Sequence, residues 1–370
     1  MTPWFRLLTF LLLPFLALSA QNTQAPQLQP RTGEPQKVAP QANGPDRQTL
    51  DRQIRIDVQV TDKSGAPALG LRKEDFTVLD DKRPQNILSF QAVDRNAPTN
   101  ADPPVELLLV IDAVNSSFQT VSYERSELKK FLLQNGGKLA QPTALIFFTD
   151  SGTQMQNGFS RDGSALAEMY DKFETGLRTV NRSQGFYGAA ERFELSLKAL
   201  NSLVAYEVPH PGRKLLVWFS AGWPLLTGPS IDYTRKDEER FFDMIVAASS
   251  EMRRADITLY SIDPLGLADA GGVRIGYYEE FLKGIKSPNK AVPADLSLQV
   301  LAVQSGGRVL NGSNDLAQEV AEAGADARAF YILSFEGARA DAANEYHAIN
   351  VTVDKPGVKV RTRTGYYAQP

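Results

Sequence analysis

The stretch Val105–Ser117, which reads VELLLVIDAVNSS, decides the fold of this chain. An apolar run ends at a single carboxylate, Asp112, and a polar turn that contains two hydroxyl groups, Ser116 and Ser117, follows it. A buried parallel strand has this continuous apolar character, and α/β proteins place ligand-facing side chains at the carboxyl ends of such strands. The stretch therefore predicts a central strand that presents Asp112 at the carboxyl edge of an α/β sheet.

Apolar strands and amphipathic helices alternate from residue 104 to residue 327. The predicted strands are 105–112, 144–149, 214–219, 257–262 and 308–310. The predicted helices are 120–133, 162–173, 189–204, 238–254, 297–304 and a last one that runs from a cap at Asn314 through Ala323. Such alternation is typical of right-handed βαβ units, so we expect a doubly wound, mostly parallel sheet with helices on both faces.

The pattern changes to a period of two on either side of this region. The predicted flanking strands are 53–61, 75–79, 87–93, 329–335, 347–353 and 358–364. Three strands are too few to close a core alone. We therefore expect the segments 51–95 and 328–370 to pair as one small β-sandwich, interrupted by the α/β domain. The alternative is two separate β additions to the edge of the main sheet.

The first 20 residues have the features of a signal peptide. Arg6 precedes the apolar run Leu7–Leu18, and the small residues of Ala17–Ala20 offer a cleavage site after Ala20. The run is short for a membrane span, which favours a signal peptide. The alternative is an N-terminal membrane anchor. Residues 21–50 are rich in Gln, Pro, Asn and Ala, which predicts a disordered linker. We expect an exported protein (periplasmic, on the cell surface or secreted) with no membrane span after signal cleavage.

Composition excludes several classes of function. The net charge of the 370 residues is −3, and no dense run of Lys and Arg is present, so no nucleic-acid partner is expected. The chain has no Cys, which excludes disulfides, thiolate metal sites, Cys nucleophiles and a lipoprotein anchor.

Six segments, taken in order, resemble the bacterial family of exported proteins with a von Willebrand factor A-related domain. They are VTDKSGAPALGLRKEDFTVLDDKRPQNILSF (60–90), LLLVIDAVNSS, KLLVWFSAG, ITLYSIDPLG, SGGRVLNGSNDLAQ and VKVRTRTGYY. The resemblance covers most of the chain after residue 50. It implies a doubly wound α/β domain flanked by β-rich segments, and a binding or adhesion role without established catalysis.

Domains of this kind often hold Mg²⁺ or Mn²⁺ through an Asp-x-Ser-x-Ser turn, a Thr and a second Asp on three loops. Asp112 and Ser116 match the first turn, but Val114 stands where its first Ser belongs. Phe186 or Tyr187 occupies the position where the motif has its Thr, and Ala221 occupies the position of the second Asp. So few oxygens cannot offset the dehydration of a small cation, so we expect a degenerate site without a metal or other cofactor.

Two alternatives remain open at this site. Asn115, Ser220 or Asp150 could replace the missing ligands and restore a site for Mg²⁺ or Mn²⁺. Without a metal, Asp112 would accept hydrogen bonds from nearby loop amides.

Other polar residues give weaker signals. Asp263 precedes Pro264 and is expected to set a turn. His210 and His347 are far apart in the sequence and do not predict a metal cluster. The segment around Ser220 lacks the first Gly of a nucleophile elbow. No convergent base and nucleophile is visible, so we do not expect an enzyme.

The predicted ligand face therefore lies at the carboxyl edge of the sheet. It comprises the segments 112–117, 184–187 and 220–226, and its candidate residues are Asp112, Asn115, Ser116, Ser220 and Trp223. Trp223 is either an exposed anchor for a partner or folds back over the sheet edge. We expect a non-enzymatic module that binds a protein in the cell envelope or outside the cell. The alternative is a structural or assembly component of the envelope without a discrete ligand site.

Overall fold

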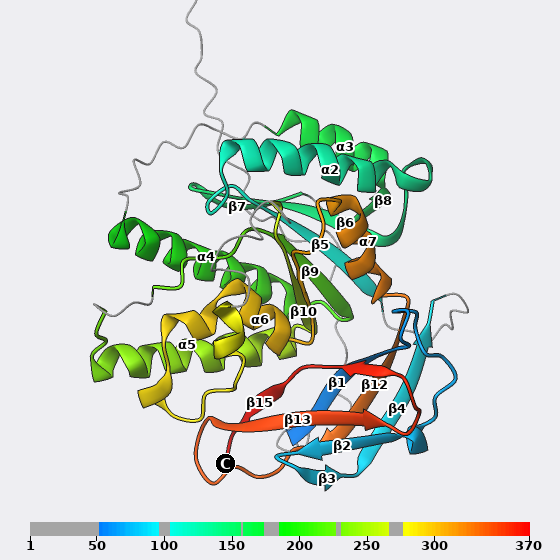
Figure 1. Ribbon diagram of the computed structural model, residues 1–370, viewed down its shortest axis with the longest axis vertical. Helices are drawn as coiled ribbons and strands as arrows, with labels where there is room; N and C mark the ends of the chain where they lie inside the picture. Colours follow the sequence, from blue (N-terminus) through cyan, green and yellow to red (C-terminus); the bar gives the residue numbers. More distant parts are fainter. Residues whose placement is uncertain (1–51, 96–103, 157, 174–184, 227–230, 266–276) are drawn as a thin grey trace, which may run out of the picture.

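A seven-stranded sheet forms the centre of the molecule (Figure 1). The computed structural model describes residues 52–95, 104–156, 158–173, 185–226, 231–265 and 277–370, and the predicted signal peptide and linker lie outside them. The strand order is β11-β10-β9-β5-β6-β7, with β8 also paired to β6. The strands are β5 (Val105–Asp112), β6 (Lys138–Thr149), β7 (Gly152–Met155), β8 (Ser160–Asp162), β9 (Arg213–Phe219), β10 (Ile257–Ile262) and β11 (Val309–Leu310). All pairs are parallel except those that β7 and β8 form with β6.

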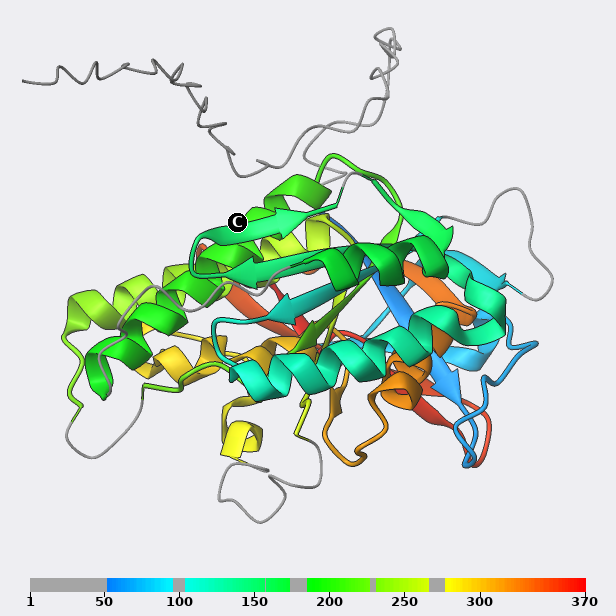
Figure 2. The same cartoon turned by 90° about the horizontal axis from the view of Figure 1, so that it is seen from above.

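Helices cover both faces of this sheet (Figures 1 and 2). Successive residues of β5 face opposite sides, because Leu108 and Val110 belong to one apolar core and Leu107, Leu109 and Ile111 to the other. The first core includes side chains of α4 (Phe186–Glu207), α5 (Arg235–Arg254) and α6 (Leu298–Gln304). The second includes side chains of α2 (Phe118–Gly137), α3 (Gly163–Lys172) and α7 (Leu316–Ala325). The prediction of a doubly wound α/β fold is confirmed.

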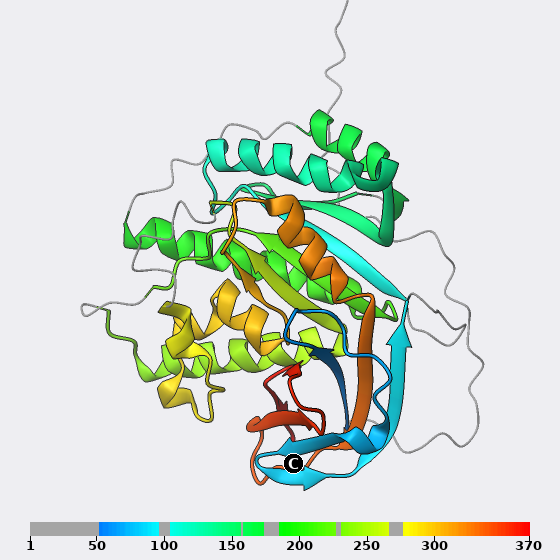
Figure 3. The ribbon, with the colours of Figure 1, turned by 45° about the vertical axis from the view of Figure 1, so that its right-hand side comes forward.

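The flanking strands form a β-sandwich beside the α/β domain (Figure 3). One sheet has the order β14-β1-β12-β4 and the other β15-β13-β2-β3, so each contains strands from both ends of the described chain. The strands are β1 (Gln53–Thr61), β2 (Phe76–Asp80), β3 (Arg83–Gln85), β4 (Ile87–Asp94), β12 (Ala329–Glu336), β13 (Glu345–Val353), β14 (Lys359–Arg361) and β15 (Gly365–Ala368). A third apolar core lies between these sheets. The sandwich predicted from N- and C-terminal strands is therefore confirmed, and the alternative of two separate additions is wrong.

Two local predictions are wrong. The last helix is capped by Asp315, whose side chain accepts a hydrogen bond from the Gln318 N–H, and not by Asn314. The predicted strand 358–364 ends already at Arg361, because the chain crosses between the sheets: β14 pairs with β1, whereas β15, which was not predicted, begins at Gly365 and pairs with β13. Among the described residues, no helix is both long enough and apolar enough to span a membrane.

A buried ionic network joins the sandwich to the amino ends of the central strands. Arg213, the first residue of β9, is 1% exposed and pairs with Asp57 of β1 at 2.9 Å. Its guanidinium group also donates to the backbone oxygen of Asp326 and lies 4.4 Å from the ring centre of Phe330. The Asp326 carboxylate in turn accepts hydrogen bonds from Tyr260 and Arg361. We call these residues the junction network.

Candidate functional site

Asp112 lies fully buried at the carboxyl end of β5, between β6 and β9. Its Oδ1 accepts hydrogen bonds from the backbone N–H groups of Val114 (2.9 Å) and Asn115 (2.8 Å). Its Oδ2 accepts from Asn115 Nδ2 (2.8 Å) and from the indole Nε1 of Trp218 (3.0 Å) on β9. Four N–H groups therefore hold this side chain and fix the turn that follows β5.

Burial dominates the electrostatics around Asp112. It raises the pKa of Asp112, although the hydrogen bonds from Trp218 and Asn115 act in the opposite direction. Glu124 of α2 is also fully buried, and neither of its carboxyl oxygens has a hydrogen-bond partner among the described residues. Burial, together with the charge of Asp112, raises the pKa of Glu124 well above its usual range. Two buried carboxyl groups that repel each other favour a state in which at least one holds a proton.

The other predicted site residues support this turn. Asn115 also donates to the Ser196 hydroxyl of α4 at 2.8 Å, which in turn donates to a backbone oxygen one helical turn earlier. Ser116 and Ser220 are buried, and the Ser220 hydroxyl accepts a hydrogen bond from the Gly222 N–H. Val114 packs into the core on the side of α4. Asp112, Ser116 and Ser220 thus lie beneath the surface of the sheet edge rather than on it, which corrects their expected place on a ligand face.

These residues do not fit a Mg²⁺ or Mn²⁺ site. Both oxygens of Asp112 face N–H hydrogens, which would repel a cation, and Val114 supplies no oxygen. In the part of the chain that the structure describes, no group of three or more His, Cys, Asp or Glu side chains is placed to hold a metal ion. The arrangement matches the alternative in which Asp112 accepts hydrogen bonds from loop amides.

The start of α4 contributes a surface of aromatic side chains. Gln184 lies outside the described residues. Gly185 is the N-cap of α4, and its φ of 93° is one that a residue with a Cβ rarely adopts. Phe186 and Tyr187, in the first helical turn, are 47% and 82% exposed. The residues that stand where the family has a Thr are therefore exposed rings at the sheet edge.

A pocket of about 600 Å³ opens at this edge of the sheet. Aromatic and aliphatic side chains dominate its lining, together with Asn115, Arg192, Gln299 and two tyrosines. The apolar residues are Phe186, Ala189, Ala221, Trp223, Pro224, Leu225, Leu226 and Ile231, and the tyrosines are Tyr277 and Tyr278. Among the residues that the structure describes, Arg192 is the only charged one that lines it. This composition suits an apolar group with a negative charge beside it.

Trp223 is part of the wall of this pocket and not an exposed anchor. It is 3% exposed, and its ring packs edge-on against Trp218 with ring centres 5.2 Å apart. The structure therefore has the second of the two alternatives, in which the ring folds back over the sheet edge. Its Nε1 is buried without a hydrogen-bond partner among the described residues.

Sequence reasoning missed six residues of this pocket, which are Ala189, Arg192, Ile231, Tyr277, Tyr278 and Gln299. Arg192 lies on α4 two turns after Gly185, on the helix face that carries Ala189, and this spacing was a usable signal. Gln299 of α6 donates to the Ala221 backbone oxygen at 3.3 Å. Tyr277 and Tyr278 begin a short 3₁₀ helix, Tyr277–Phe281, that is distant in sequence from the other residues of the pocket. No local pattern could bring these last three to the site.

The remaining candidates lie apart from the pocket. Asp263 follows β10, and its side chain accepts a hydrogen bond from the Leu265 N–H, which is the expected turn. His210 lies in the loop before β9, whereas His347 lies on β13 of the sandwich and contacts Asp80 at 2.9 Å. The two histidines belong to different parts of the fold.

Comparisons with known proteins give likenesses of fold alone. A scan against protein-family models and a search of the curated proteins found no match. Similar solved structures include the human COPII-coat protein Sec24c (8% identity, 73% of this chain and 44% of that chain, TM-score 0.33). Others are the conserved hypothetical protein BatB from Bacteroides thetaiotaomicron (12% identity, 61% and 98%, TM-score 0.29) and the SpRpn10 VWA domain (14%, 59% and 94%, TM-score 0.23).

All three TM-scores are below 0.5, so these likenesses carry no argument. The fold class is therefore taken from the strand order and the layers of this chain. A mostly parallel sheet with helices on both faces defines a doubly wound α/β domain, which is the fold that the resemblance implied. This chain adds to that domain a β-sandwich built from strands on both sides of it.

Proposed function

We propose that this chain is an exported, non-enzymatic module that binds a protein partner through the carboxyl edge of its central sheet, without a metal ion. The observation that carries the proposal is the 600 Å³ pocket beside the exposed rings of Phe186 and Tyr187. Export rests on the signal-peptide features of residues 1–20. The partner would then be met in the cell envelope or outside the cell.

The pocket indicates the chemistry of the partner. Its walls would bury an apolar side chain, and aromatic residues are the usual anchors of protein interfaces. Arg192 would pair with a carboxylate beside that side chain, and the described part of the lining contains no Asp or Glu to compete with it. We therefore propose a partner segment in which an apolar residue lies next to an acidic one.

We propose that partner binding needs no metal ion, because an arginine replaces the cation. In a metal-dependent domain, the partner's carboxylate completes the coordination of the cation. Here, the N–H groups around Asp112 hold the edge in shape, and Arg192 supplies the positive charge. Chelation would therefore leave partner binding unchanged.

Site-specific photocrosslinking tests this proposal in the producing cell. A photoreactive phenylalanine analogue at Tyr187 should crosslink a discrete protein, because this ring is 82% exposed beside the pocket. The same analogue at Leu88, which is 52% exposed on β4 of the sandwich, is the matched control. Replacing Arg192 by Gln should reduce the crosslink from position 187 by about tenfold.

Three outcomes would contradict the proposal. Equal crosslinking from positions 187 and 88, or no crosslink from 187, would favour a structural envelope component without a discrete ligand site. Loss of the crosslink in chelator and its recovery in Mg²⁺ would instead indicate a working metal site.

A further inference from the structure

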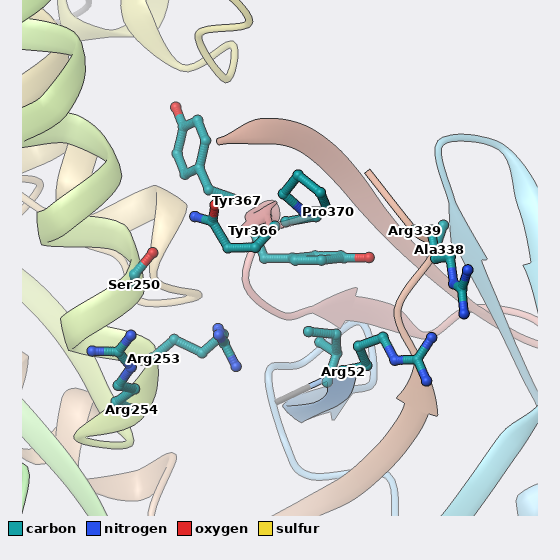
Figure 4. A pocket seen from close by; sticks show the side chains of 12 residues that line it. Arg52, Ser250, Arg253, Arg254, Ala338, Arg339, Tyr366, Tyr367 and Pro370 are labelled. Carbon is teal, nitrogen blue, oxygen red and sulfur yellow. The ribbon is translucent and has the colours of Figure 1, made fainter. Parts of the chain in front are cut away.

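A second pocket, of about 450 Å³, lies where the sandwich meets the C-terminal end of α5 (Figure 4). Four arginines from three separate segments line it: Arg52 before β1, Arg253 and Arg254 at the end of α5, and Arg339 after β12. None of the described residues that line it is an Asp or a Glu. In a chain of net charge −3, this is a local concentration of positive charge.

Nearby carboxylates neutralise only part of this charge. Glu251 pairs with Arg254 on the surface of α5. Within the part of the chain that the structure describes, the side chains of Arg52 and Arg339 form no ion pair. In Figure 4, Arg253 reaches from α5 toward the middle of the pocket, and Arg52 and Arg339 lie on its opposite side.

The positive charge of Arg253 also acts on a further arginine, Arg363. Arg363 is buried, and burial together with the neighbouring charge of Arg253 lowers its pKa to about 10. Like charges held together in this way repel one another, and an anion bound among them would relieve that repulsion.

The back wall of the pocket is rigid. Tyr366 is buried, and its hydroxyl group donates to Asp80 at 2.8 Å, while its ring stacks on His347. Asp80 also accepts a hydrogen bond from the Ala338 N–H, which holds the segment that leads to Arg339. Tyr367 on the same strand donates to the Ile285 backbone oxygen at 3.1 Å. Anchored walls of this kind lower the entropy that binding would otherwise lose.

We propose that this pocket binds the terminal phosphate group of a ligand. A phosphomonoester carries roughly −1.5 to −2 charges on three oxygens, whereas a carboxylate carries a single charge. Several converging guanidinium groups match the multiply charged group better, because each presents a planar fork of donors that binds phosphate oxygens in pairs. The phosphate could belong to a small phosphorylated molecule or to a lipid headgroup, and the two sources share this chemistry.

Isothermal titration calorimetry with pyrophosphate, at physiological ionic strength, tests the proposal on the full chain without its first 20 residues. The unmodified protein should bind pyrophosphate, and the double variant Arg52→Gln, Arg339→Gln should bind it at least about tenfold more weakly. Both side chains are at the pocket rim and partly or fully exposed, so the variant should fold. Arg235→Gln, at the other end of α5 and 90% exposed, is the matched control and should bind like the parent.

Vesicles of phosphatidylcholine with and without phosphatidic acid separate the two sources. Binding to phosphatidic acid that the double variant loses would assign the phosphate to a lipid, and pyrophosphate binding without vesicle binding would assign it to a soluble molecule. The proposal is overturned if neither probe binds, if the double variant binds as well as the parent, or if hexaglutamate binds more tightly than pyrophosphate. None of these results depends on the partner site at the carboxyl edge.

Discussion

The two ends of β9 differ in the kind of polar contact that they make. At its first residue, Arg213 is buried as an ion, paired with Asp57 and hydrogen bonded to the Asp326 backbone. At the other end, Trp218 donates its indole N–H to Asp112, and no cation of the described chain pairs with that buried carboxyl group. The amino edge of the sheet thus uses charge to attach the sandwich, and the carboxyl edge uses neutral donors to shape a pocket.

We infer from this contrast that the amino edge of the sheet determines the stability of the fold and the carboxyl edge determines partner binding. Loss of one partner of a buried ion pair leaves the other charge without compensation, whereas loss of one N–H donor leaves a single acceptor unsatisfied. The largest effects on folding should therefore come from the junction network, and the effects on binding should come from the pocket.

Replacing Arg213 by Ala should have the largest effect. The change removes the ion pair with Asp57, the hydrogen bond to Asp326 and the contact with Phe330, so the free energy of unfolding should fall by about 3–5 kcal/mol. Urea unfolding followed by circular dichroism measures it. Arg235→Ala, an exposed arginine, should change the value by less than about 0.5 kcal/mol. Similar small losses in both variants would show that the junction network does not hold the two parts together.

Replacing Asp112 by Asn should have an intermediate effect. An amide group would place N–H hydrogens opposite either two backbone N–H groups or the side chains of Asn115 and Trp218, so the free energy of unfolding should fall by about 1–3 kcal/mol. Asp263→Asn, directly after β10 of the same sheet, keeps an oxygen for the Leu265 N–H and is the control. An Asp112 variant as stable as the parent would refute the proposed role of the four hydrogen bonds.

The comparison with the sequence shows where pattern is informative. The apolar run of β5 located Asp112 and its edge correctly, because continuous burial of a parallel strand leaves a signature in consecutive residues. The start of β9 was placed one residue late, at Lys214, because nothing local indicates that Arg213 is buried. Its burial depends on Asp57 and Asp326, which are distant in sequence.

The candidate site was predictable to a similar extent. Asn115 and Trp223 do line the pocket, but the burial of Trp223 follows from its contact with Trp218, which no local pattern encodes. The tyrosines of the 3₁₀ helix Tyr277–Phe281 reach the pocket only through tertiary structure. The early end of the last predicted strand at Arg361, and the separate strand β15 after it, likewise depend on two different partner strands.

A smaller effect concerns the pH dependence of stability near the carboxyl edge. Burial raises the pKa of Glu319 in α7 to about 7, from an ordinary value of 4.5. The folded state therefore binds more protons than the unfolded state between these values, and the free energy of unfolding should fall as the pH rises through this range. In Glu319→Gln this fall should be reduced.

Urea midpoints of the parent and the variant at about pH 5 and about pH 8 measure this difference. The urea midpoint of the variant, relative to that of the parent, should be higher at about pH 8 than at about pH 5. Glu168→Gln, at an exposed position on α3, is the control and should follow the parent. Parallel pH profiles for the parent and Glu319→Gln would show that this carboxyl group does not titrate in the folded state as proposed.

The smallest expected effect tests the central claim, that N–H groups and not a cation hold Asp112. The chain has three tryptophans, so the indole N–H resonance of Trp218 can be assigned in a ¹H–¹⁵N spectrum with the variants Trp218→Phe and Trp223→Phe. This N–H group donates its hydrogen bond to Asp112 Oδ2. A paramagnetic ion bound to that carboxylate would therefore broaden the N–H signal beyond detection. Titration with Mn²⁺ to a modest excess should leave the resonance unchanged in position and width. Selective loss of the Trp218 signal at stoichiometric Mn²⁺, reversed by excess Mg²⁺, would contradict the account.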